Sequence, residues 1–206
     1  MVGGAQETRA AVSVAAVVLA AGRGTRMGGQ KLLLPLAGRA LVQWVVDAAL
    51  GSQAKETIVV VGHEAGRLAE ALAGRPVTVV VNERYEEGMS TSLQVGVRAA
   101  GAAREAVVFL LADQPFVDSA LVDLLIDRFA ESKMDVVRPV IAGRPAHPVL
   151  MGARLFPEIL AQRGDVGGRE IIRRHPGRVC LVPVDDSRVA HDIDSMGDYE
   201  AARESA

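Results

Sequence analysis

The sequence is poor in cysteine and aromatic residues and carries almost no net charge. Cys180 is the only cysteine among 206 residues, which excludes an internal disulfide framework and a cysteine-rich metal site. A formal net charge of −2 gives no indication of a basic surface that would bind nucleic acid or an anionic membrane. No apolar run is long enough to span a bilayer, and the first residues lack the pattern of a signal peptide. We therefore expect a cytoplasmic protein that binds neither nucleic acid nor membranes.

The abundant residues predict an α/β fold. Apolar residues make up 50% of the chain and aromatic residues only 3%, as buried strands flanked by helices require. The alternation of strand-like and helix-like segments favours a three-layer α/β/α sandwich with a mostly parallel, Rossmann-like sheet. We expect a flexible N-terminus over residues 1–12, a single domain over 13–206, and a monomer or weak dimer. Strands are expected at 14–19, 57–61, 77–81, 106–111, 135–141, 148–151 and 178–184, and helices at 40–50, 64–73, 89–101, 118–130, 154–160, 168–174 and 196–205.

The segment 17–31, VVLAAGRGTRMGGQK, is the strongest functional signal. A buried strand runs into a glycine-rich loop whose exposed N–H groups, together with Arg23, Arg26 and Lys31, suit a polyphosphate. The loop matches neither the P-loop pattern nor the G-x-G-x-x-G dinucleotide pattern. An ordinary strand-to-helix turn is the alternative interpretation.

Three carboxylates are candidate metal ligands. Asp113 follows the apolar run 106–111, so it is expected near the edge of the sheet that carries the glycine-rich loop. Asp192 and Asp194 alternate in HDIDSMGDY, and in a strand both would point to one face. Either could complete a Mg²⁺ site with Asp113, with Asp194 favoured. A turn or cap role is the alternative for Asp113. Of the pair, we expect one aspartate to cap the final helix and the other to bind the metal.

Two further clusters are candidate substrate contacts. Gly88 and the hydroxyl run Ser90–Thr91–Ser92 stand at a predicted helix start, where one hydroxyl would suffice as a cap. The loop GRPAHPV presents His147, and Arg163 or Arg169 near a later helix start could hold an anionic acceptor. A structural role is the alternative for His147.

The blocks LAAGRGTRMGGQK, GMSTSL, ADQP, GRPAHPV and RGDVGGRE together resemble the MobA-like nucleotidyltransferases over residues 14–202. Within that family, the segment LAAG, with Ala21 at the discriminating position, resembles the molybdenum cofactor cytidylyltransferases. The resemblance therefore implies CTP as the nucleotide. It implies a triphosphate site, a nucleoside site, a Mg²⁺ ligand and an acceptor side. The implied triphosphate residues are Leu19, Ala20, Ala21, Gly22, Arg23, Gly24, Arg26 and Lys31; the nucleoside residues are Asn82, Gly88, Ser90 and Ser92; the Mg²⁺ ligand is Asp113; and the acceptor residues are His147, Gly167, Gly168 and Arg169.

The resemblance implies transfer of CMP from CTP to a phosphorylated pterin, with Mg²⁺ as cofactor and pyrophosphate as product. Arg23, Arg26, Lys31 and Asp113 are the expected catalytic residues. A molybdoenzyme client is a possible protein partner. An NAD(P)H-dependent oxidoreductase on the same fold and a non-catalytic cofactor carrier are the alternatives.

Overall fold

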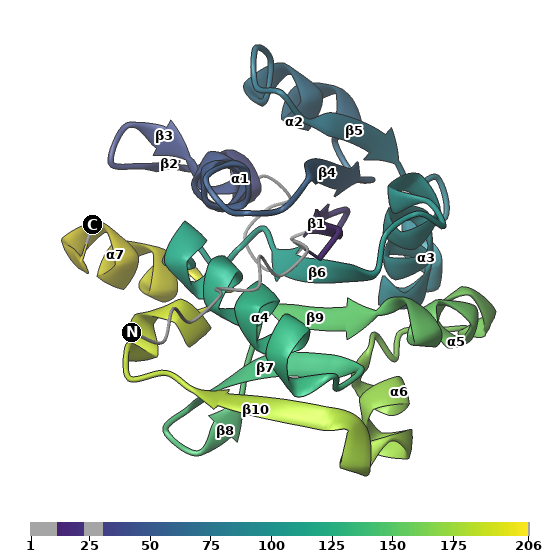
Figure 1. Ribbon diagram of the computed structural model, residues 1–206. Coiled ribbons are helices and arrows are strands. Elements are labelled where there is room, and N and C mark those ends of the chain that lie inside the picture. The colour runs from purple at the N-terminus through teal and green to yellow at the C-terminus, as the bar shows by residue number, and fades with distance from the viewer. Residues whose placement is uncertain (1–11, 23–30, 206) are drawn as a thin grey trace, which may run out of the picture.

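The computed structural model describes residues 12–22 and 31–205. Its main sheet has eight strands, seven of them in the order β10-β7-β9-β6-β1-β4-β5, and β8 pairs with β7 (Figure 1). A separate hairpin joins β2 to β3. The strands are β1 (Val14–Ala20), β2 (Pro35–Leu36), β3 (Arg39–Ala40), β4 (Glu56–Val61), β5 (Thr78–Val81), β6 (Ala106–Leu111), β7 (Val136–Ile141), β8 (Arg144–Pro145), β9 (Val149–Gly152) and β10 (Val179–Pro183).

The strands at the centre of the sheet run parallel. β1 lies between β4 and β6, and both pairings are parallel, so the three strands end at one edge of the sheet. β9 lies antiparallel to both of its neighbours, β6 and β7. The apolar, β-branched sequence of β1 and β4 fits strands that are covered on both faces. The predicted mostly parallel sheet is therefore confirmed, with one antiparallel strand inserted.

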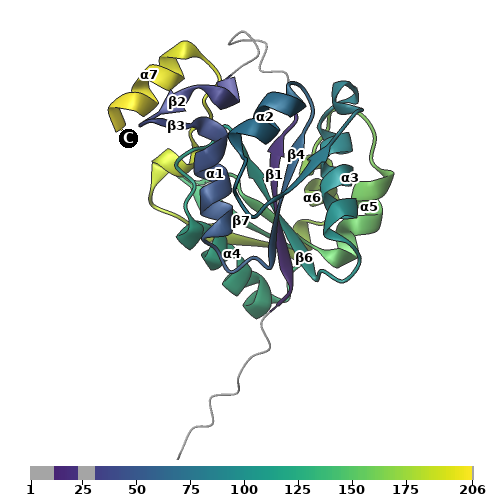
Figure 2. The same ribbon diagram turned by 90° about the horizontal axis from the view of Figure 1, so that it is seen from above.

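Helices cover both faces of the sheet, as Figure 2 shows. α1, α2 and α4 pack their apolar side chains on one face, and α3, α5 and α6 pack theirs on the other. The α-helices are α1 (Leu41–Leu50), α2 (Ala65–Ala71), α3 (Met89–Ala100), α4 (Ser119–Ser132), α5 (Phe156–Ala161), α6 (Arg169–Arg174) and α7 (Met196–Ser205). Short 3-10 turns are η2 (Lys31–Leu33), η3 (Tyr85–Glu87), η4 (Ala153–Leu155), η5 (Pro176–Arg178) and η6 (Ser187–Ala190). The three-layer sandwich is confirmed.

A third, smaller core joins the β2–β3 hairpin and α1 to the C-terminal end of the described chain. Leu36 of the hairpin and Leu41 of α1 pack with Ile193, Tyr199 and Ala202 at the C-terminal end. Figure 2 shows α7 lying beside β2 and β3. This core holds the segment before α7 against the body of the protein.

Most predicted elements lie within a few residues of the observed ones. Asp118 caps α4, because its Oδ1 accepts a hydrogen bond from the N–H of Leu121 at 2.8 Å. The β2–β3 hairpin was not among the predicted strands, and the predicted helix 154–160 divides into η4 and α5. Within residues 12–22 and 31–205, no helix is both long and apolar enough to cross a membrane. The flexible N-terminus predicted for residues 1–12 lies almost wholly outside the described residues.

Candidate functional site

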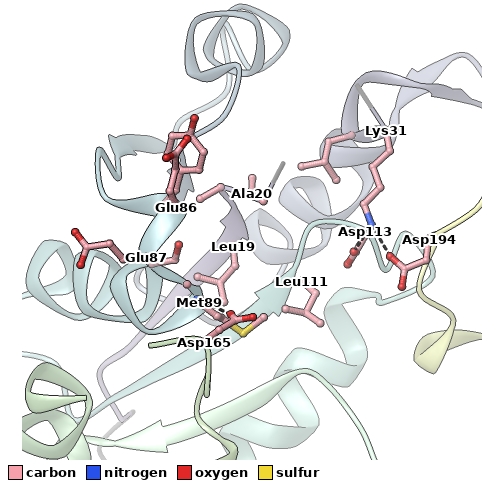
Figure 3. A pocket seen from close by; sticks show the side chains of 16 residues that line it. Leu19, Ala20, Lys31, Glu86, Glu87, Met89, Leu111, Asp113, Asp165 and Asp194 are labelled. Carbon is pink, nitrogen blue, oxygen red and sulfur yellow. Dashed lines mark hydrogen bonds and ion pairs between the residues drawn. The ribbon is translucent and has the colours of Figure 1, made fainter. Parts of the chain in front are cut away.

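A cavity of about 680 Å³ lies at the edge of the sheet where the parallel strands end (Figure 3). β1 leads into it through Ala20, Ala21 and Gly22, and β6 ends at its wall with Leu111. Open α/β sheets bind their ligands at this edge. The predicted residues Leu19, Ala20, Ala21 and Gly22 all line the cavity.

Lys31, Asp113 and Asp194 meet at one end of the cavity (Figure 3). The Nζ of Lys31 donates to Asp113 Oδ2 at 2.7 Å and to Asp194 Oδ1 at 2.9 Å. The N–H of Ile193 donates to the carbonyl of Asp113 at 3.0 Å, which fastens the C-terminal segment beside β6. Two carboxylates from distant parts of the chain thus converge on one cation.

The same contacts keep Lys31 charged. Burial by itself lowers the pKa of Lys31, but the charge and hydrogen bond of Asp113, followed by those of Asp194, outweigh burial and raise the pKa above its usual value. The ammonium group is therefore protonated at neutral pH.

Asp192 is placed differently from Asp194. Residues 191–195 form no strand, so the predicted alternation of Asp192 and Asp194 on one strand face is wrong. Asp192 does not line the cavity; its Oδ1 accepts from Gln114 Nε2 at 2.7 Å. Burial raises the pKa of Asp192, the bond from Gln114 opposes this, and the charges of Asp113 and Asp194 raise it further. Within the described part of the chain, no group of three or more His, Cys, Asp or Glu side chains is arranged to hold a metal ion.

Neither of these aspartates caps the final helix. Ser195 Oγ accepts from the N–H of Asp198 at 3.2 Å, and Asp198 Oδ2 accepts from the N–H of Ser195 at 2.7 Å. This reciprocal pair is a capping box, which uses Ser195 and Asp198 at the start of α7. The expected capping role of Asp192 or Asp194 is therefore corrected.

The other end of the cavity is built around the start of α3 (Figure 3). Asp165 Oδ1 accepts from the N–H of Met89 at 2.9 Å and so joins the loop before α6 to α3. Gly88 fits this junction because its φ is 108° and a Cβ there would lie 2.7 Å from the Cα of Asp165. Gly88, one of the predicted nucleoside residues, lines the cavity.

Carboxylates dominate the cavity wall. Glu86, Glu87 and Asp165 line it together with Asp113 and Asp194, and Lys31 is the one basic residue among the described lining residues. Glu86, Glu87 and Asp165 were not predicted, although each lies within three residues of a glycine that was: Gly88 or Gly167. A polyphosphate would be repelled by this wall, so its binding requires further cations. Two of the predicted cations, Arg23 and Arg26, and the loop residue Gly24 lie outside the described residues.

The predicted polar contacts near α3 divide into two groups. Ser92 lines the cavity, whereas Asn82 and Ser90 do not. Asn82 is buried, and its Nδ2 donates to Thr91 Oγ1 at 2.8 Å and to Ser92 Oγ at 3.0 Å. Ser90 Oγ is buried and has no hydrogen-bond partner among the described residues. Asn82 therefore positions Ser92, and nothing places Ser90 on the cavity wall.

The predicted acceptor residues lie beyond the cavity wall. His147, Gly167, Gly168 and Arg169 do not line the cavity. Gly167 packs against the first residue of α3, since a Cβ at Gly167 would lie 3.0 Å from Met89 Sδ. Burial, followed by the positive charges of Arg138 and Arg169, lowers the pKa of His147 to about 4, although a backbone hydrogen bond with Phe109 works against this. His147 is therefore neutral at pH 7.

Known proteins resemble the chain over most of its length. The model of the MobA-like NTP transferase domain matches residues 16–179. A protein named nicotine blue oxidoreductase, from Paenarthrobacter nicotinovorans, is 32% identical over 193 residues, which cover 89% of this chain and 93% of that protein.

Solved structures agree with this match. Rv0371c from Mycobacterium tuberculosis H37Rv superposes with a TM-score of 0.85 at 29% identity, covering 94% of this chain and 98% of that one. The complex of Rv0371c with manganese gives a TM-score of 0.81 at 28% identity, with 95% and 100% covered. A nucleotidyl transferase from Methanothermobacter thermautotroptrophicus gives 0.79 at 30% identity, with 94% and 97% covered.

The parallel sheet and the cavity at its edge define an α/β protein of the nucleotidyltransferase type. The chain belongs to the MobA-like NTP transferase domain family, which its match over residues 16–179 shows. The predicted family and fold are thereby confirmed.

Proposed function

We propose that the protein is a Mg²⁺-dependent nucleotidyltransferase that moves CMP from CTP to a phosphorylated pterin, such as the molybdenum cofactor, and releases pyrophosphate. The observation that carries this proposal is that the carboxylates of Asp113 and Asp194 converge on the ammonium group of Lys31, inside the cavity of a MobA-like fold. The choice of CTP and of a pterin rests on the resemblance of LAAG and GRPAHPV to the cytidylyltransferases.

The two carboxylates fit a divalent cation. Asp113 Oδ2 and Asp194 Oδ1 both lie within 3 Å of the Lys31 Nζ, so two hard oxygen donors face one position. Such oxygens are the ligands that Mg²⁺ and Mn²⁺ prefer. The structurally similar Rv0371c binds manganese. When bound, the cation would neutralise phosphate charge, and Asp113 and Asp194 would hold it.

The chemistry requires positioning and charge neutralisation rather than a protein base. An oxygen of the acceptor's phosphate forms a bond to the α-phosphorus of CTP while the bond from that phosphorus to the bridging oxygen breaks, and pyrophosphate leaves with the electron pair. A phosphate oxygen is already nucleophilic. Lys31 lines the cavity and carries an ammonium group that is protonated at neutral pH, so it can donate a hydrogen bond to the developing negative charge. Arg23 and Arg26 are proposed to act with it.

A panel of ligands in a thermal-shift experiment tests nucleotide choice. CTP, GTP, ATP, UTP, NADH and NADPH are each added with and without Mg²⁺, and the melting temperature is measured. We expect the largest rise with CTP and Mg²⁺ together, because a ligand that binds only the folded state stabilises it. A rise with GTP instead would overturn the choice of CTP.

The role of Asp113 is tested by its isosteric amide. Asp113→Asn is expected to lower the rate of pyrophosphate release by at least about 100-fold, because it removes one charged ligand of the cation. Asp127→Asn, an exposed carboxylate on α4, is the matched control and should leave the rate unchanged. Full activity of Asp113→Asn with Mg²⁺ would reject the metal assignment.

An oxidoreductase is the second candidate, since nicotine blue oxidoreductase is 32% identical over 89% of this chain. In that case NADH or NADPH would raise the melting temperature, Mg²⁺ would make no difference, and CTP would have no effect. Nucleotide binding without pyrophosphate release would instead favour a non-catalytic cofactor carrier.

A further inference from the structure

The ammonium group of Lys31 lies between the two carboxylates that are proposed to hold the divalent cation (Figure 3). Its Nζ is 2.7 Å from Asp113 Oδ2 and 2.9 Å from Asp194 Oδ1. A bond from oxygen to Mg²⁺ is shorter, about 2.1 Å, so a cation bonded to Asp113 Oδ2 would lie within about 5 Å of the Lys31 Nζ. The lysine and a divalent cation therefore face the same two oxygens at close range.

Two positive charges this close repel each other, and the surroundings strengthen the repulsion. The side chain of Lys31 is 12% exposed and that of Asp113 is 23% exposed. Charges interact more strongly where water is scarce. A divalent cation that approaches the carboxylates while Lys31 stays between them therefore binds less tightly than it would to the carboxylates alone.

Lys31 is able to leave the carboxylates without rearrangement of the sheet. Its charge stands at the end of a flexible four-carbon stem, and the residue begins the short turn η2 rather than lying within a strand. Lys31 and Gly22 line the same cavity, in which the nucleotide is proposed to bind. Phosphate oxygens in this cavity would give the ammonium group other acceptors, and both carboxylates would then face the cation alone.

We infer that Lys31 is the counter-ion of the cation site in the nucleotide-free protein and gives up this place when the phosphates of the nucleotide bind. The cation and the nucleotide then strengthen each other's binding, because the cation repels the ammonium group from the carboxylates and the phosphates attract it. Lys31 is thus a positioning residue for the cation. The inference rests on the proposed function in one respect, namely that Asp113 and Asp194 hold a divalent cation.

A calorimetric titration of the nucleotide-free full chain with Mn²⁺ tests the counter-ion role. Lys31→Met removes the charge but keeps an unbranched side chain, and its thioether is a poor ligand for Mn²⁺. We expect Lys31→Met to bind Mn²⁺ at least about tenfold more tightly than the parent, because the repulsion is gone. Lys31→Ala carries the same expectation and replaces Lys31→Met if that variant fails to fold. Equal or weaker binding of Mn²⁺ would overturn the inference.

Three control variants assign the gain in affinity to the charge of Lys31. Lys55→Met removes an exposed lysine and should bind Mn²⁺ as the parent does. Lys31→Arg keeps the positive charge and should bind no more tightly than the parent; a gain equal to that of Lys31→Met would attribute the effect to packing and contradict the inference. The double variant Lys31→Met with Asp113→Asn should lose the gain. A gain that persists in the double variant would place Mn²⁺ elsewhere and overturn the inference.

The link to the nucleotide is tested by the affinity for CTP with and without Mg²⁺. In the parent, Mg²⁺ has already moved Lys31 from the carboxylates when CTP binds, whereas without Mg²⁺ the CTP must do so itself. Mg²⁺ should therefore strengthen CTP binding by a factor at least about threefold larger in the parent than in Lys31→Met. Equal factors in the two proteins would contradict a movement of Lys31 on nucleotide binding.

The outcomes separate this inference from the proposed function. If neither the parent nor Lys31→Met binds Mn²⁺, the metal assignment and the inference both fail. If the two proteins bind Mn²⁺ equally tightly, the metal assignment stands and the counter-ion role of Lys31 fails. If CTP binds to neither protein while Lys31→Met still gains affinity for Mn²⁺, the proposed function fails and the counter-ion role stands.

Discussion

At the scale of single residues, the site is shaped by charged groups that are partly removed from water. Lys31 has a raised pKa because two carboxylates outweigh its burial, and His147 has a lowered pKa because burial and two arginines act in the same direction. At neutral pH, Lys31 is therefore protonated and His147 is not. The partners of Lys31 lie 82 and 163 residues away in the sequence.

The lowered pKa of His147 predicts a loss of stability in mild acid. The pKa of about 4 in the folded state lies below the ordinary histidine value of 6.5, so between these pH values the unfolded chain binds more protons. Stability is therefore lost as the pH falls through this window, by about 2 kcal/mol at pH 5 relative to pH 8.

Urea denaturation at pH 8 and pH 5, in buffers free of sulfate and phosphate, measures this loss. His147→Gln should show a pH dependence smaller by about 2 kcal/mol. His191→Gln removes an exposed histidine and should behave as the parent does. Equal pH dependence in all three proteins would contradict the burial of a neutral His147.

At the scale of elements, close packing of α3 on the sheet fixes the start of the helix beside the cavity. Gly96 allows this approach, since a Cβ there would lie 2.6 Å from Cγ1 of the buried Val17 on β1. Ser92 and Met89, on the same helix, line the cavity. A shift of α3 would therefore change the site as well as the core.

Alanine substitutions at two helical glycines distinguish the effect of close packing on stability from the effect of helix propensity. Gly96→Ala should lower the free energy of unfolding by about 1–3 kcal/mol, because Val17 cannot yield without disturbing the sheet. Gly66→Ala, in α2 with nothing within 4 Å of its Cβ position, should raise it by about 0.5 kcal/mol. Urea denaturation measures both. Stabilisation by Gly96→Ala would show that α3 does not pack as closely as the structure indicates.

At the scale of the whole molecule, the C-terminal segment completes the site. Ile193 is fully buried in the core formed by the hairpin, α1 and α7, and the next residue, Asp194, reaches Lys31. Packing outside the cavity thus sets the position of one proposed cation ligand.

Matched core truncations test this coupling. Ile193→Ala and Ile159→Ala each remove a fully buried side chain, and each should lower the free energy of unfolding by about 2–4 kcal/mol. Only Ile193→Ala should also weaken Mn²⁺ binding, by about tenfold, because it loosens the support of Asp194. Calorimetric titration with Mn²⁺ provides the measurement. Equal Mn²⁺ affinity in the two variants would show that packing in the third core does not support the position of Asp194.

The amino-acid sequence by itself determined the elements and one edge of the site. Periodicity fixed most strands and helices within a few residues, because each pattern depends only on near neighbours. The end of β1 and Asp113 were placed at one edge of the sheet because parallel strands end at a common edge, and both line the cavity. The tertiary structure alone decided which distant residues meet. Lys31 contacts Asp113 and Asp194 across 82 and 163 residues, and β9 enters the sheet antiparallel. These contacts and the direction of β9 depend on how the whole chain packs. A local sequence pattern reports only near neighbours, so it cannot predict them.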